Sequence, residues 1–224
     1  MRINKFLNDA GQCSRREADR LIEAGRVKIA GRIAKLGEQV EEGERVEVDG
    51  KAVVPPAHRT YLAYHKPIGV IVTTDPNSPD NVMQDLKQSG KPLPKARLFP
   101  VGRLDVASSG LLLLTDDTAF ADAALRPSSG HEKEYEVEVV LPVEDAFLKK
   151  MAEGVVIMGR KTRPARVTRI DEKRFRIVLT EGMNRQIRRM CEALRIEVRR
   201  LKRVRFMNVE IGSLLPGEWR VLSG

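Results

Sequence analysis

An aspartate in a short glycine-bounded loop is the residue whose type and setting best suit chemistry. Residues 102–105 read Gly-Arg-Leu-Asp, and a run of four leucines follows at 111–114, which must form a buried strand. A polar loop held against a buried strand can fix a reactive carboxylate in place. On pattern alone, the simpler interpretation of Asp105 is a turn residue paired with Arg103.

A tyrosine in an alternating segment is the second candidate. Charged and apolar residues alternate from position 131 to 139, so Tyr135 shares a face with Val137 and Val139, while the glutamates at 132, 134, 136 and 138 point the other way. Its ring is therefore expected to face inward. Spacing alone does not distinguish an active-site tyrosine from an ordinary core tyrosine.

An arginine beside an apolar helix face is the third candidate. On a helix over residues 184–194, Ile187, Met190, Cys191 and Leu194 form one apolar face. At about 100° per residue, Arg188 lies at the rim of this face, whereas Arg185 and Arg189 lie on the far side. Only Arg188 is placed to reach a buried carboxylate and keep it ionised, because a nearby cation lowers the pKa of an acid.

The elements that must position these residues indicate an α+β domain over residues 61–224, built on a largely antiparallel mixed sheet with flanking helices. Expected strands cover residues 61–64, 70–73, 110–114, 135–140, 174–179 and 198–206. Expected helices cover residues 118–125, 143–153 and 184–194.

A small α/β domain is expected over residues 1–54, followed by a linker at 55–60. Ser14 and Glu17 have the spacing of a capping box that starts a helix, and Gly25 ends it. Short strands follow at 26–29 and 45–48. Arg15, Arg16 and Arg20 project near the start of this helix, where amides and cations together favour phosphate.

Composition points to a polyanionic partner. The 224 residues carry a formal net charge of +9, and residues 185–205 hold nine basic against two acidic side chains. Two separate basic regions, this one and residues 1–35, favour nucleic acid over a merely solvated surface. Only two cysteines and three histidines are present, so no zinc site or disulfide framework is expected. The lack of an apolar leader predicts a cytoplasmic protein, which we expect to be a monomer.

Two known families resemble the two parts of the chain. Residues 2–7, 14–19, 25–27 and 46–50 are similar to an S4 domain, a small RNA-binding module, although Ala30 stands where that family usually has Asn. The Gly-Arg-Leu-Asp loop, with the Ser-Ser-Gly-Leu-Leu-Leu-Leu-Thr run after it, resembles the catalytic motif of pseudouridine synthases of the RsuA branch. The segment 184–192 and the ending at 217–220 look most like the RluF subgroup.

The resemblance implies a site and a reaction without metal or cofactor. Asp105 would be the carboxylate that detaches uracil from ribose and allows reattachment through carbon 5. Arg103 would enter the RNA helix and hold the target nucleotide out of the stack. Tyr135 in the Lys-x-Tyr element would pack on the base, and Arg188 would pair with Asp105.

The expected substrate is ribosomal RNA. The resemblance to the RluF subgroup implies a uridine of 23S rRNA near the peptidyl transferase region, with a tRNA anticodon stem as a further substrate. Besides Arg103, the residues expected to contact RNA are Arg2, Lys5, Arg15, Arg16, Arg20, Arg185, Arg189, Arg200, Lys202 and Arg203.

Three alternatives stay open at this stage. One is a 16S rRNA pseudouridine synthase, and another is a non-catalytic rRNA-binding or ribosome assembly factor. The third, a nucleoside-cleaving hydrolase, needs a second inward-facing acid. The four glutamates of segment 131–139 point away from the Tyr135 face and do not supply one.

Overall fold

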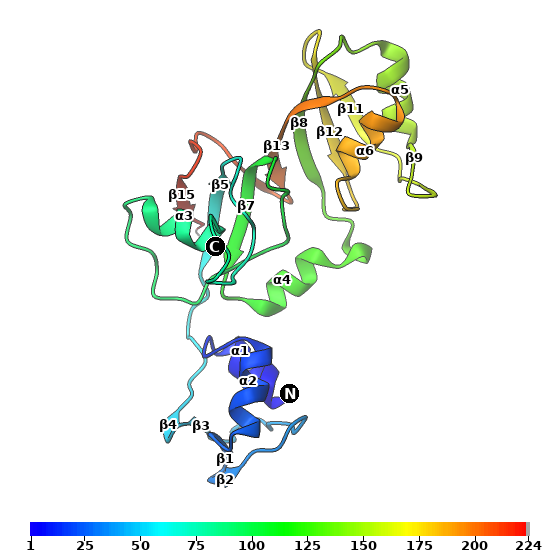
Figure 1. The fold of residues 1–224 in the computed structure, drawn as a ribbon. Helices are drawn as coiled ribbons and strands as arrows, with labels where there is room; N and C mark the ends of the chain where they lie inside the picture. Colours follow the sequence, from blue (N-terminus) through cyan, green and yellow to red (C-terminus); the bar gives the residue numbers. More distant parts are fainter. Residues whose placement is uncertain (223–224) are drawn as a thin grey trace. The chain divides into compact units, whose positions relative to one another are not determined.

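The computed structural model describes residues 1–222, which form two compact units (Figure 1). The first unit contains residues 1–60 with 94–99 and 115–119, and the remaining described residues form the second. Residues 55–60, expected as a linker, belong to the first unit. Among residues 1–222, no helix is long and apolar enough to cross a membrane.

The first unit combines two helices with a small antiparallel sheet around one apolar core. The helices are α1 (Ile3–Asp9) and α2 (Arg15–Glu23). The sheet has the order β2 (Arg32–Ile33), β1 (Val27–Ile29), β3 (Val46–Val48), β4 (Lys51–Ala52). The hydroxyl of Ser14 accepts a hydrogen bond from the Glu17 amide at 3.2 Å, so the predicted cap of α2 is confirmed.

The second unit is built on a nine-stranded sheet. Its main strand order is β11 (Arg166–Arg169), β12 (Arg174–Leu179), β8 (Lys133–Val139), β13 (Val198–Phe206), β7 (Ser109–Thr115), β5 (Tyr61–Lys66), β15 (Trp219–Val221). In addition, β14 (Val209–Glu210) pairs with β13 and β6 (Phe99–Pro100) with β7. Strands β7 and β13 run parallel, whereas β11, β12, β8 and β13 are antiparallel, as are β5 and β15. The fold is therefore α+β with a mixed, largely antiparallel sheet.

The remaining described elements after residue 60 are helices and a separate two-stranded hairpin. They are α3 (Val82–Gln88), α4 (Thr118–Leu125), the short 3-10 helix η1 (Pro127–Ser129), α5 (Asp145–Glu153), α6 (Gln186–Ala193), and the two-stranded hairpin of β9 (Val156–Ile157) and β10 (Arg160–Lys161). The strand expected at 70–73 is not formed; Ile71 makes only an isolated bridge with Asn81.

A continuous apolar core joins α5 and α6 to one face of the β8–β12–β13 part of the sheet. The inward residues Val137 and Val139 of β8 belong to it, as do Ile187, Met190 and Cys191 of α6. The face of α6 predicted from spacing is thus confirmed as a core face. This packing fixes the helix that carries Arg188.

Candidate active site

The loop that carries Asp105 is tied down at both ends. The Val101 amide donates to the Leu113 carbonyl at 2.8 Å, and the Ser108 amide donates to the Asp105 carbonyl at 3.0 Å. The Gly69 amide donates to the Val106 carbonyl at 2.9 Å, which joins the loop to the turn after β5. Asp105 itself is half-buried. These bonds hold a partly exposed carboxylate in one place, as a reactive group requires.

A glycine lets the strand after this loop approach β13 unusually closely. Gly110 has φ +110°, and a Cβ built there would lie 2.2 Å from the Arg203 carbonyl oxygen and 2.5 Å from the Arg203 nitrogen. The parallel register pairs Ser109 with Lys202 and Gly110 with Arg203. Any larger residue at 110 must push the two strands apart. The position of Asp105 relative to β13 therefore depends on this glycine.

Arg188 reaches from α6 to the same loop. Its Nη2 donates to the Ala107 carbonyl at 2.8 Å and its Nη1 to the Val198 carbonyl at 3.1 Å. Burial and the charge of Arg185 lower the pKa of Arg188, whereas the charge of Asp105 raises it. Among residues 1–222, no ion pair joins Arg188 to Asp105 directly. Arg188 thus supplies positive charge near Asp105 and bonds the backbone two residues after it.

The Nε of Arg188 is buried without a hydrogen-bond partner, and so is the hydroxyl of Ser108 in the Asp105 loop. Buried donors of this kind are rare in folded proteins, because leaving them unpaired costs free energy.

Tyr135 lies on the inward face of β8 as predicted. It is partly buried and packs against the core formed with α5 and α6. The register places it opposite Arg203 of β13 and Ile177 of β12. The inward orientation is confirmed, whereas its role in chemistry stays a prediction.

The outward glutamates of β8, together with Glu132 just before it, are held by arginines from neighbouring strands. Glu132 and Glu134 both bind Arg205, at 2.9 and 2.8 Å. Glu136 binds Arg176 at 2.8 Å, and Glu138 lies 3.3 Å from Arg199. These carboxylates are on the face opposite Tyr135, so they do not supply the second acid that the hydrolase alternative needs.

Comparison with known proteins assigns the family. Residues 60–193 match the RNA pseudouridylate synthase family, and residues 1–53 match the S4 domain. The dual-specificity RNA pseudouridine synthase RluF of Escherichia coli (strain K12) is 41% identical over 225 residues, which covers 100% of this chain and 76% of RluF. The chain belongs to the RNA pseudouridine synthase family.

Two further relatives support the assignment. An uncharacterized RNA pseudouridine synthase of Aquifex aeolicus is 38% identical over 229 residues, covering 100% of this chain and 90% of its own length. A crystal structure of a pseudouridylate synthase matches with a TM-score of 0.71 and 30% identity, covering 100% of this chain and 96% of that one. The chain is therefore an RNA pseudouridine synthase enzyme with an S4 domain.

Lys66 is a residue of this synthase that the sequence did not place in the site. It is fully buried at the end of β5, and its Nζ donates to the carbonyls of Pro67 and Val70 at 2.7 and 2.8 Å. Burial lowers the pKa of Lys66 to about 8, while the charges of Asp85 and Asp105 oppose this shift. Lys66 therefore braces the turn that bonds the Asp105 loop. The available signal was a lysine, next to His65, at the end of a strand whose other residues are apolar or aromatic.

The predicted RNA-binding residues of the synthase differ in exposure. Those with exposed side chains are Arg2, Arg15, Arg16, Arg20, Arg103, Arg185 and Arg200. Lys5, Arg189 and Lys202 are half-buried. Lys5 also binds Asp9 at 2.8 Å, and Arg20 lies 3.3 Å from Glu17, so RNA must compete with these partners.

Arg203 corrects one prediction. Its side chain is 2% exposed, donates from Nε to the Leu111 carbonyl at 2.7 Å, and stacks over the Phe206 ring at 5.4 Å. The sequence interpretation treated residues 199–205 as one basic surface, but the alternation of β13 turns this residue inward. In the described structure Arg203 does not present its guanidinium to a phosphate.

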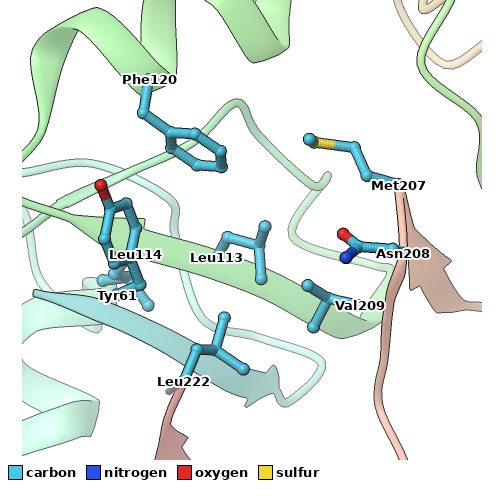
Figure 2. A pocket seen from close by; sticks show the side chains of 8 residues that line it. All are labelled: Tyr61, Leu113, Leu114, Phe120, Met207, Asn208, Val209 and Leu222. Carbon is cyan, nitrogen blue, oxygen red and sulfur yellow. The ribbon is translucent and has the colours of Figure 1, made fainter. Parts of the chain in front are cut away.

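An apolar cavity of about 350 Å³ lies elsewhere in the second unit. Figure 2 shows its lining side chains, among them Leu113 of β7, Phe120 of α4 and the polar Asn208 between β13 and β14. None of the candidate catalytic residues lines it. Among residues 1–222, no group of three or more His, Cys, Asp or Glu side chains could hold a metal ion.

Proposed function

We propose that the synthase isomerises a specific uridine of 23S rRNA, with tRNA as a second substrate, and that Asp105 is its nucleophile. The observation that carries the proposal is the fixed, half-buried Asp105 carboxylate, with the cation of Arg188 bonded to its loop. The printed name of the RluF relatives, dual-specificity RNA pseudouridine synthase, supports more than one RNA as substrate.

In the proposed reaction, a carboxylate oxygen of Asp105 bonds to C1′ of the flipped uridine as the bond between C1′ and N1 breaks and its electron pair leaves with the uracil. The uracil turns, C5 bonds to C1′, and the bond between C1′ and the Asp105 oxygen breaks, which restores the carboxylate. The proton on C5 is lost while N1 gains one, so reactants and products have the same atoms and charge. Tyr135 supports the base from the inward face of β8, and Arg188 holds the backbone of the Asp105 loop through the Ala107 carbonyl. Arg103, exposed on the same loop, holds the vacated position in the RNA.

Tritium release tests this proposal. Transcripts of 23S rRNA, 16S rRNA and tRNA labelled at carbon 5 of uridine lose tritium when C5 is substituted. We expect release from the 23S transcript, loss of release with Asp105→Asn, and unchanged RNA binding by that variant. Asp122→Asn, an exposed aspartate on α4, is the matched control and should keep full activity. Equal release by Asp105→Asn refutes the nucleophile, and release from 16S alone refutes the substrate.

A further inference from the structure

The β9–β10 hairpin has an unusual residue at its tip. Ile157 pairs with Arg160, so Met158 and Gly159 form a two-residue turn, with φ of +50° and +74°. Turns of this kind favour Asn, Asp or Gly at the first position. The turn between β3 and β4 follows that rule with Asp49 and Gly50. A methionine there is unfavourable for the backbone, as is Ala30 at the same position of the turn between β1 and β2. Unlike that alanine, Met158 places a long apolar side chain at the tip.

The same methionine is exposed to solvent. Its side chain is 68% exposed, and that of Val156 on the same face of the hairpin is 62% exposed, whereas Ile157 between them is buried. The hairpin therefore presents a small apolar ridge outward. A methionine thioether is flexible and polarisable, which suits contact with a flat aromatic surface such as a base.

The hairpin is held rigidly by its base. The Val155 amide donates to the Thr162 hydroxyl at 3.0 Å, and the Thr162 amide donates to the Val155 carbonyl at 3.0 Å. The largely buried carboxylate of Glu181 accepts from the Arg163 amide at 2.9 Å and from the Gln186 side chain at 3.0 Å. This carboxylate ties the hairpin to the start of α6, and β9 lies beside that helix (Figure 1).

Cations surround the ridge. Residues 155–163 contain Arg160, Lys161 and Arg163, all exposed, and no acid. The guanidinium of Arg160 lies 3.2 Å from the Glu181 carboxylate and that of Arg163 lies 3.9 Å from it. The register places Lys161 directly opposite Val156. From α6, the guanidinium of Arg189 contacts the Met158 sulfur. An exposed apolar tip bordered by cations matches a nucleic acid, which offers phosphates beside aromatic bases.

We propose that the β9–β10 hairpin is an RNA-binding element, in which Met158 lies against an unstacked base while Lys161 contacts a flanking phosphate. Arg160 contacts a second phosphate in exchange for its ion pair with Glu181. This inference rests on the proposed function, because it requires an RNA substrate. It adds a contact surface that the basic residues of α6 alone do not define.

Replacing the methionine separates RNA binding from stability. Met158→Asn gives the turn a preferred residue, so the unfolding temperature should stay the same or rise. Ala30→Asn is the matched control for stability, because Ala30 occupies the same position, with φ +48°, in the turn between β1 and β2. It measures how much the preferred residue raises the unfolding temperature. We expect Met158→Asn to weaken binding of the 23S transcript by about fivefold or more, the lower end of the cost of losing a base-stacking side chain.

A charge variant tests the phosphate contact independently. Lys161→Ala should reduce the slope of log affinity against log salt by about one. Lys149→Ala, an exposed lysine on α5, should leave the slope unchanged. If the wild-type enzyme releases tritium while both hairpin variants bind RNA as tightly as it does, the hairpin inference is wrong. If the wild-type enzyme neither binds nor modifies the transcripts, the proposed function itself is wrong.

Discussion

Replacing Gly110 with alanine should destabilise the second unit and displace the Asp105 loop. The new Cβ would lie 2.2 Å from the Arg203 carbonyl oxygen, whereas ordinary contact begins at 3.4 Å, so β7 and β13 must separate by about 1.2 Å. The φ of +110° adds backbone strain of about 1 kcal/mol. Weakening of the short β7–β13 pairing adds about 2–3 kcal/mol. We expect a loss of about 3–4 kcal/mol in the free energy of unfolding.

Gly90→Ala is the matched control for Gly110→Ala. Gly90 also has a positive φ, +74°, but a Cβ there meets nothing within 4 Å. It should cost only the backbone strain of about 1 kcal/mol. Urea unfolding of both variants measures the difference, and single-turnover tritium release measures the effect on the loop. Equal stabilities of the two variants would refute the packing cost, and unchanged single-turnover release by Gly110→Ala would mean that the close approach of β7 and β13 does not position Asp105.

Three other predictions address the site and the fold. Arg188→Gln should slow single-turnover tritium release about 10²-fold or more, because Arg188 bonds the Ala107 carbonyl of the Asp105 loop at 2.8 Å. RNA affinity in a filter-binding assay should stay nearly constant. A variant that binds RNA more weakly but releases tritium at the wild-type rate would contradict this. The pKa of Lys66 is lowered to about 8 in the folded protein, so as the pH rises this lysine loses its proton at a lower pH in the folded protein than in the unfolded chain. The free energy of unfolding of the wild type should therefore rise by up to roughly 3 kcal/mol relative to that of Lys66→Met as the pH rises from 8 towards 10.5. Urea unfolding at a series of pH values measures this difference in stability, and a difference that does not change with pH would refute the prediction. Ser14→Ala should cost about 1 kcal/mol through loss of the α2 cap, seen in thermal unfolding, and no change in unfolding temperature would count against that cap.

Much of the fold could be predicted because its main elements are long and periodic. The bounds of α4, β12 and β13 agree with those expected. The β9–β10 hairpin was missed, because strands of two residues carry no periodicity. The expected strand at 70–73 failed because the backbone there follows a turn and makes one bridge only.

The candidate site was predicted unevenly. Helical spacing placed Arg188 at the rim of the core correctly, because α6 has a clear apolar face and the position of a side chain around a helix depends only on residue spacing. The sequence did not predict that the side chain of Arg203 points inward, because the neighbouring residues of the strand are also basic. The burial of Lys66 depends on tertiary packing between β5 and the Asp105 loop, which a single sequence does not express.

Mapping pseudouridines in the RNA of a deletion strain tests the central claim most directly. We predict that one pseudouridine of 23S rRNA is lost, that the intact gene restores it, and that a gene encoding Asp105→Asn does not. The tRNA of the same strain shows whether the second substrate is used. Restoration by Asp105→Asn, or an unchanged set of pseudouridines in both RNAs, would contradict the account.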